Sequence, residues 1–143
     1  MIIGKAIYAI LSGNATVSSA VGQNISAQMA PEATRTGGYP QIVYESHGTE
    51  NSKTNDGKSG FVQQRIRIFC QALSYDTADA LSQAVNSVMM GLPKGTYGGL
   101  TVAGAFFAGE DEGTEAIGPV GQDVLVYFKS IDYTIWYYLP GTT

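Results

Sequence analysis

The chain has 143 residues and a formal net charge of −4, and only 14% of its residues are charged. This length predicts a single domain, residues 1–143, with a core of its own. The acidic balance argues against a protein that grips nucleic acid by its phosphates, because that needs clustered Lys and Arg. Cys70 is the only cysteine, which excludes an intrachain disulfide and a cysteine-based metal cage. No apolar run reaches the ~20 residues that span a bilayer, and no secretory leader is recognisable, so we expect a soluble protein made in the cytoplasm.

The first part of the chain predicts two short helices followed by two strands. Residues 2–12 carry isoleucine and leucine at helical spacing, and a Gly-Asn pair of the kind that ends helices follows them. Residues 16–21 predict one further helical turn, with Thr16 as its cap. Residues 25–29 predict a strand that stops before a proline. Pro40 opens the next strand, where its missing N–H does least harm.

The middle of the chain gives the clearest strand and the clearest helix. Residues 61–72 alternate apolar and polar side chains, except that Gln64 falls on the apolar face. A helix is expected over residues 76–92, because apolar side chains recur along one side of this segment. Asp76 is the expected cap, and Asp79 at the third position makes an imperfect capping box.

Two long polar segments interrupt these patterns. Residues 48–60 have no apolar member, and residues 108–121 are rich in glycine and acidic residues. Segments of this length and polarity are typical of exposed loops. The sequence therefore predicts two long loops.

The last third of the chain predicts a turn and two strands. Residues 94–99 are a glycine-rich turn, and residues 100–107 and 123–139 are strands. In the first strand the alternation places Val102 on one face, opposite Ala103, Ala105 and Phe107. The terminal strand is apolar on both faces, which is typical of a central strand or of one with a bulge.

These elements predict an α+β fold. Hairpin-like neighbours lie toward each end of the chain and a helix lies between them, which favours a mainly antiparallel sheet with two helices packed on one face. No internal repeat and no interdomain linker is visible.

No constellation of side chains supports catalysis. His47, the only histidine, ends a predicted strand beside a polar segment, where an ordinary surface residue is expected. Cys70 lies on the apolar face of its strand and reads as a structural thiol. The acidic run from Glu110 to Glu115 lacks the spacing of a calcium loop. We therefore expect no enzyme activity, no cofactor and no bound metal.

The charged side chains are better candidates for contacts between subunits. Arg65 and Arg67 share a strand face that is normally solvated, and at an oligomer interface they could meet the acidic segment of a neighbour. The acidic segment could face a basic partner or line a passage for DNA. The candidate contact residues are Glu50, Lys53, Asp56, Lys58, Arg65, Arg67, Glu110, Asp111, Glu112 and Glu115.

The order of four segments carries a family resemblance. They are the opening helix with the Thr16–Gly22 segment, the Ile25–Pro31 strand followed by Tyr39-Pro40-Gln-Ile-Val-Tyr44, the Val62–Gln71 strand running into the Asp76–Leu92 helix, and the terminal Ile131-Asp-Tyr-Thr-Ile-Trp-Tyr-Tyr. In this order and total length the chain resembles the tail completion proteins of long-tailed bacteriophages. These small proteins are also called tail terminators or head–tail joining proteins.

The resemblance implies a structural virion protein of the tail or neck. Proteins of that family form a ring, usually a hexamer, on the head-proximal end of the tail tube. The ring halts growth of the tube and provides the surface to which the head connector or stopper protein joins. The implied partners are copies of the same chain, the tail tube protein and that connector, with genomic DNA passing through the lumen without specific binding and no membrane involved. The family contributes no catalytic motif. In such an assembly we expect the polar segments 48–60 and 108–121 to contact neighbouring rings.

Three other readings remain open at this point. The protein could be another ring of the neck or tail, such as a stopper, a connector or a tube subunit. It could be a small cellular α+β module that binds a ligand in an apolar pocket. An enzyme is the reading that the sequence supports least, because it offers a single histidine and no catalytic motif.

Overall fold

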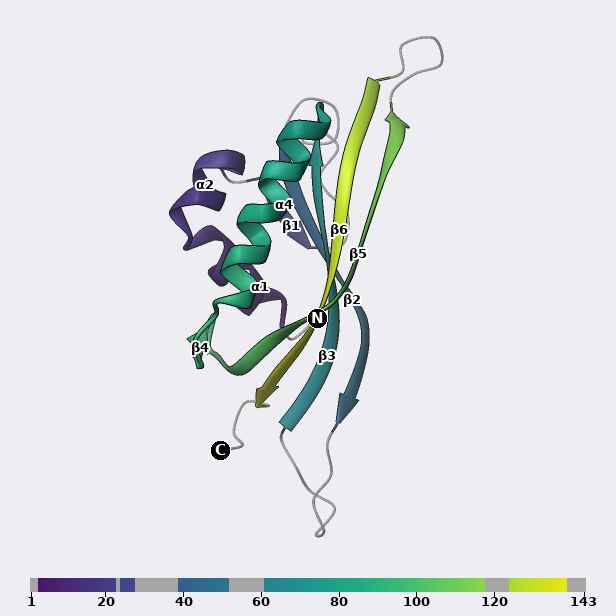
Figure 1. Cartoon of the computed structure of the whole chain (residues 1–143). Helices are drawn as coiled ribbons and strands as arrows, with labels where there is room; N and C mark the ends of the chain where they lie inside the picture. Colours follow the sequence, from purple (N-terminus) through teal and green to yellow (C-terminus); the bar gives the residue numbers. More distant parts are fainter. Residues whose placement is uncertain (1–2, 23, 28–38, 52–60, 118–123, 139–143) are drawn as a thin grey trace.

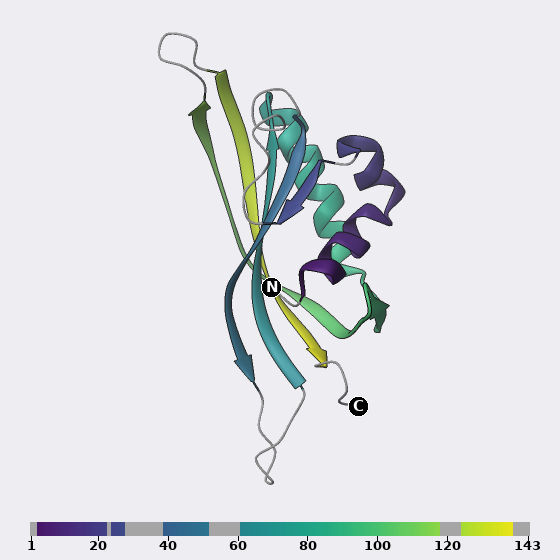
Figure 2. The ribbon, with the colours of Figure 1, turned by 180° about the vertical axis from the view of Figure 1, so that it is seen from behind.

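A six-stranded sheet carries the three described helices on one of its faces (Figures 1 and 2). The computed structural model describes residues 3–22, 24–27, 39–51, 61–117 and 124–138. The strand order is β1-β2-β3-β6-β5-β4. The bounds are β1 (Ile25–Ala27), β2 (Gln41–Asn51), β3 (Phe61–Ala72), β4 (Gly95–Tyr97), β5 (Leu100–Ile117) and β6 (Val124–Tyr138).

Three helices occur in the described ranges: α1 (Gly4–Ser12), α2 (Ala15–Val21) and α4 (Tyr75–Met90). The side chain of Asn14 caps α2 by accepting a hydrogen bond from the Val17 N–H at 3.1 Å, so Thr16 is not the cap. None of these helices is long and apolar enough to cross a membrane.

Helix α4 begins earlier than its sequence predicts. Ser74 is the N-cap, and its hydroxyl accepts a hydrogen bond from the Thr77 N–H at 3.2 Å. Asp76 therefore lies in the first turn, where a carboxylate interacts favourably with the helix dipole. Asp79 does not complete a capping box; its carboxylate points to the sheet and meets Lys129.

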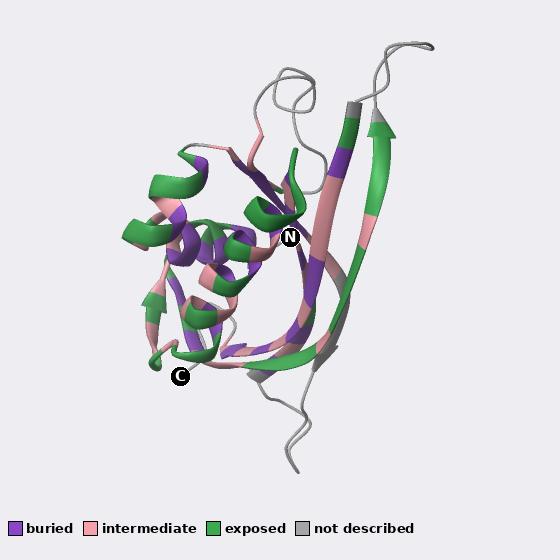
Figure 3. Ribbon diagram, turned by 45° about the horizontal axis from the view of Figure 1, so that its top comes forward, coloured by how far each residue is buried: buried purple, intermediate pink, exposed green. Residues whose placement is uncertain are grey.

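The expected fold class, a mainly antiparallel sheet with two helices on one face, is wrong. The strand pair β1–β2 is parallel, with Ile25 beside Ile42, while the other pairs are antiparallel, so the sheet is mixed. The sheet also curves into a half-barrel, and α2 is a full third helix rather than one turn (Figure 3). Strands dominate the described residues because β5 runs far beyond its expected end.

The core lies between the helices and the inner face of the sheet. Residues alternate into this core along β3, as its pattern predicts, and along β6 from Ile131 to Tyr137. Tyrosine hydroxyls tie the two layers together: Tyr44 donates to the Gly4 carbonyl at 3.1 Å, and Tyr133 donates to Asn86 Oδ1 at 2.7 Å. The largest buried apolar side chains include Ile3, Ile7, Leu11, Ile42, Ile66, Ile68, Met89, Ile131 and Ile135.

The segment predicted as an acidic loop is part of a strand. Residues 108–117 continue β5 and pair with β6, from Gly109 beside Asp132 to Ile117 beside Val124. An edge strand tolerates this composition because its exposed positions do not need apolar side chains. The expectation of a long loop over residues 108–121 is therefore wrong for the part up to Ile117, and the remainder lies outside the described residues. The expected loop over residues 48–60 is likewise wrong for the part up to Asn51, where β2 ends, and residues 52–60 lie outside the described residues.

Two irregularities in β5 shift the alternation that the sequence predicts. The pairing with β6 skips one residue between Val102 and Gly104 and another between Phe107 and Gly109. As a result Val102, Ala105 and Phe107 all face the helices, opposite Tyr137, Ile135 and Tyr133. The predicted placement of Val102 on the other face from Phe107 is wrong, because the first bulge moves the side chains between it and the second bulge to the opposite face.

Candidate functional site

The face of the sheet away from the helices is the strongest candidate for an interaction surface. It carries an edge-to-face pair of Phe69 and Phe128, with ring centroids 6.1 Å apart. A second such pair, Phe106 and Trp136, lies toward the other end of β6, with centroids 6.4 Å apart. Along β6, a charged group made of Asp132 and the arginines that contact it lies between these two aromatic pairs. None of the helices in the described part of the chain covers this surface, and we call it the helix-free face.

The charged group pairs two predicted contact residues with a residue of the same chain. Arg67 donates to both carboxylate oxygens of Asp132, at 2.8 and 3.2 Å, and this hydrogen bond raises the pKa of the Arg67 guanidinium. Arg65 lies 3.9 Å from the same carboxylate and stays 55% exposed. Arg67 is thus held by its own chain, while much of Arg65 remains accessible to another molecule.

The acidic run of β5 divides between the two faces of the sheet. Glu112 lies beside Lys129 and faces the helices, where it contacts the Lys129 ammonium at 3.5 Å and accepts a hydrogen bond from the Tyr75 hydroxyl at 3.2 Å. Asp111, one position away, lies on the helix-free face and contributes to the raised pKa of Arg67. The residues predicted as one acidic cluster therefore lie on two different faces of the sheet and have different partners.

The other predicted contact residues are distributed as follows. Glu110 and Glu115 are exposed on β5, which is green over most of its length in Figure 3. Glu50 lies on β2 beside Gln63. Lys53, Asp56 and Lys58 lie outside the described residues. The structure thus brings Arg67, Asp111 and Asp132 together and leaves the rest of the set spread along β2, β3 and β5.

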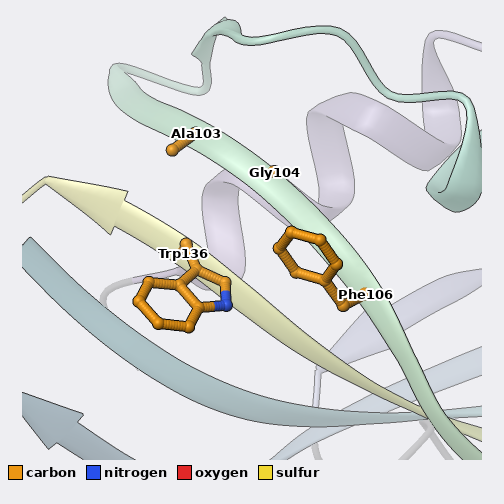
Figure 4. A pocket seen from close by; sticks show the side chains of 4 residues that line it. All are labelled: Ala103, Gly104, Phe106 and Trp136. Atoms are coloured by element: carbon orange, nitrogen blue, oxygen red, sulfur yellow. The ribbon is translucent and has the colours of Figure 1, made fainter.

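A hollow that the sequence did not indicate opens on the helix-free face. It has a volume of about 540 Å³ and is lined by Ala103, Gly104, Phe106 and Trp136 (Figure 4). Two rings form its walls, one from β5 and one from β6, and the small residues at the β5 bulge leave the space between them. The phase shift at the bulge is what puts Phe106 on this face, so alternation alone could not have found it.

Cys70, Tyr133 and Tyr137 are buried in the core. Burial raises the pKa of the Cys70 thiol to about 12, and burial also raises the pKa of Tyr133 and of Tyr137. The Tyr137 hydroxyl donates to Gln64 Oε1 at 2.9 Å, which explains the polar exception on the apolar face of β3. Within the described residues no group of three or more His, Cys, Asp and Glu is placed to hold a metal ion.

Comparison with known proteins finds similar structures but no similar sequence. No family model matches the chain, and no curated protein sequence matches it. Its structure is similar to that of a chain from "Virion of native gene transfer agent (GTA) particle", with a TM-score of 0.61 and 14% sequence identity. The match covers 95% of this chain and 94% of that chain. At such low identity the two chains are shown to share a fold.

Proposed function

We propose that this protein is a structural component of a phage-like virion and that it acts as a tail terminator. In this role it forms a closed ring that caps the head-proximal end of the tail tube and joins the tube to the head connector. The observation that carries the proposal is the end-to-end match with a chain of a virion particle, which covers 95% of this chain. The order of elements in the sequence supports the same role independently.

The shape of the sheet suits a subunit that must contact two different rings. The β2–β3 pair ends at Asn51 and Phe61 at one end of the molecule, and the β5–β6 pair ends at Ile117 and Val124 at the opposite end (Figures 1 and 2). A terminator needs two unlike axial surfaces, one that copies the stacking contact of a tube subunit and one that does not. Strand ends of different sequence at opposite ends of one rigid sheet provide such surfaces.

The side-chain chemistry also suits an assembly. The helix-free face presents aromatic pairs and one exposed arginine, and aromatic residues and arginine are enriched at protein interfaces. The low content of charged residues, 14%, is compatible with subunits that bury much of their surface against copies of themselves. The net charge of −4 suits a lumen through which duplex DNA slides without being held.

Negative-stain electron microscopy of the purified full chain, alone and mixed with tail tubes of the same virus, tests the proposal. We expect closed rings that cap one end of each tube and prevent further elongation. Long filaments from the protein alone would identify a tube subunit instead. A monomer that leaves tubes uncapped and still elongating would contradict the terminator role.

A pair of variants tests the assignment of the two ends. Glu115→Arg changes an exposed residue near the β5–β6 end, and Thr49→Arg changes a position near the β2–β3 end. Each bulky charge should block the contact at its own end while rings still form. We expect one variant to lose tube capping and the other to lose connector binding. Loss of the same function by both variants would contradict the division of roles.

A further inference from the structure

The outer side of β5 is an open sheet edge. On one side β5 pairs with β6 along nearly its whole length, but on the other side it pairs with β4 only over Leu100–Val102. From Ala103 to Ile117 no strand among the described residues occupies that outer side. Backbone N–H and C=O groups on such an edge are ready partners for another extended chain.

The first half of this edge is apolar and has a recess beside it. Residues 103–109 contain no charged side chain. Phe106 is 56% exposed on the helix-free face, and Phe107 is 47% exposed on the other. The hollow between Phe106 and Trp136 adjoins this half, so a side chain of a strand paired to β5 could enter it (Figure 4).

The second half of the edge is acidic. Glu110, Asp111, Glu112 and Glu115 are all exposed there. Glu112 shares the Lys129 ammonium with Asp79, and the other three add negative charge near the edge. An acidic strand placed alongside would be repelled, because like charges on directly opposed residues are destabilising.

Charge therefore argues against a second copy of this chain as the occupant. The chain is acidic overall, with a net charge of −4. Its other long strand near an edge, β2, runs beyond its last pairing with β1 at Tyr44 and carries Glu45 and Glu50 there. Neither strand offers the basic side chains that the acidic half of β5 would attract.

We propose that the open edge of β5 binds an extended segment of a different, basic partner protein by strand addition. The segment places an apolar side chain in the hollow at Phe106 and Trp136, and it places Lys or Arg opposite the acidic half. Backbone hydrogen bonds give the affinity, and the recess and the charges give the specificity. This surface goes beyond the proposed function, since it is independent of whether the chain forms a ring.

A fluorescein-labelled peptide of about fifteen residues is the probe, a length that covers the edge from Ala103 to Ile117 at ~3.3 Å per residue. Its first half alternates Val with Thr and its second half alternates Lys with Thr. A second peptide has the reversed sequence, because the added strand could run parallel or antiparallel to β5. Fluorescence anisotropy with the full chain measures binding. We expect one of the two peptides to bind, and added salt to weaken its binding. The same peptide with Glu in place of Lys should bind at least tenfold more weakly.

Three variants locate the binding to this edge. Ala108→Pro removes an N–H at the residue that the β5–β6 pairing skips, where proline disturbs the sheet least, and it should weaken binding about tenfold. Phe106→Ala should weaken it about fivefold, and Glu115→Gln should reduce its salt dependence. The matched controls are Ala108→Ser, which keeps the N–H, and Phe69→Ala, which removes a ring elsewhere on the same face.

Amide hydrogen exchange and a modified peptide keep the test decisive if Ala108→Pro unfolds. The peptide should protect amides within residues 103–117 of the unmodified protein. Two further peptides carry N-methyl groups, one on the odd-numbered and one on the even-numbered residues. Only one of them should lose binding, because alternate N–H groups of an added strand face β5. Absence of binding by both peptides, or protection elsewhere, would overturn the proposal. So would concentration-dependent protection of residues 103–117 in the protein alone, because a second copy would then occupy the edge. Ring formation and tube capping are scored separately by microscopy, so failure here does not count against the terminator role.

Discussion

The Lys129 ammonium lies 2.6 Å from the Asp79 carboxylate and fastens the middle of β6 to helix α4. Its surroundings extend the link to β5, since Glu112 lies 3.5 Å away. The ring of Tyr75, at the start of α4, lies 5.5 Å from the same ammonium. One mostly buried lysine thus joins three elements at the point where the long β5–β6 hairpin leaves the cover of the helices.

Replacing Lys129 by methionine should lower the free energy of unfolding by about 1–2 kcal/mol, because it removes a charge-assisted hydrogen bond from a partly exposed site. Methionine keeps the aliphatic volume, so packing is little changed. Urea denaturation measures the effect. Lys5→Met, at an exposed lysine on α1, is the control and should change stability by less than about 0.5 kcal/mol. Equal losses in the two variants would contradict a special role for Lys129.

The contribution of Lys129 should disappear at alkaline pH. The hydrogen bond to Asp79 raises the pKa of Lys129 above its ordinary value of 10.5. A group whose pKa is raised by folding stabilises the native state fully below the unfolded value and loses that contribution as the pH rises through the folded value. The difference in unfolding free energy between the wild type and Lys129→Met should therefore be constant near neutrality and shrink above pH 10.5. Burial also raises the pKa of Tyr133 and of Tyr137, but both tyrosines are common to the two proteins, so their contributions cancel in the difference.

The turn between β4 and β5 should tolerate a side chain at one glycine and reject it at the other. Gly98 and Gly99 have φ of 58° and 82°, as expected for a two-residue hairpin turn. A Cβ on Gly98 would lie 2.6 Å from the Lys5 backbone, whereas a Cβ on Gly99 would have nothing within 4 Å. Both alanine variants pay for the left-handed conformation, about 1 kcal/mol, but Gly98→Ala must also displace α1.

We expect Gly98→Ala to lower the free energy of unfolding by at least about 2 kcal/mol more than Gly99→Ala does, since it adds overpacking against backbone to the conformational cost. Thermal or urea unfolding of the two variants side by side measures this difference. Equal stabilities would mean that α1 does not pack against this turn.

Much of the fold could be predicted where a strand or helix buries one complete face. The alternation along residues 61–72 and the helical pattern along residues 76–92 identify β3 and α4, because burial on one face imposes the period. Even the exception was informative: Gln64 lies on the buried face of β3, and there it donates to Ser46 Oγ at 2.6 Å and accepts from Tyr137. A polar residue on an apolar face indicates a buried partner.

The hydrogen bond between Tyr137 and Gln64 should be costly to remove from one side alone. Tyr137→Phe leaves the Gln64 oxygen unpaired in the core and should cost about 1–3 kcal/mol. Gln64→Met with Tyr137→Phe should cost less than the sum of the two single changes, because no polar atom of the pair then remains without a partner. A double-mutant cycle by urea denaturation measures the coupling, and additive effects would show that the hydrogen bond contributes nothing.

The features that the sequence could not predict depend on how distant strands pair with one another. The parallel contact of β1 with β2 and the side-by-side placement of Arg67 and Asp132 follow from tertiary register, which local patterns do not encode. The acidic end of β5 resembles a loop because an edge strand needs no alternation on its exposed positions. The Phe106–Trp136 hollow needs a bulge that shifts the faces by one residue. The residues of the proposed interface were therefore the hardest to predict.

Cys70 should not react with thiol reagents while the protein is folded. Its side chain is fully buried on β3, and burial raises its pKa to about 12, so the reactive thiolate is scarce at pH 8. We expect Ellman's reagent to label Cys70 only as fast as the chain unfolds, with the labelling rate rising in step with the unfolded population as urea is added. Rapid labelling of the native protein, before any change in circular dichroism, would contradict the burial of this thiol and would reopen the possibility of cysteine chemistry at β3.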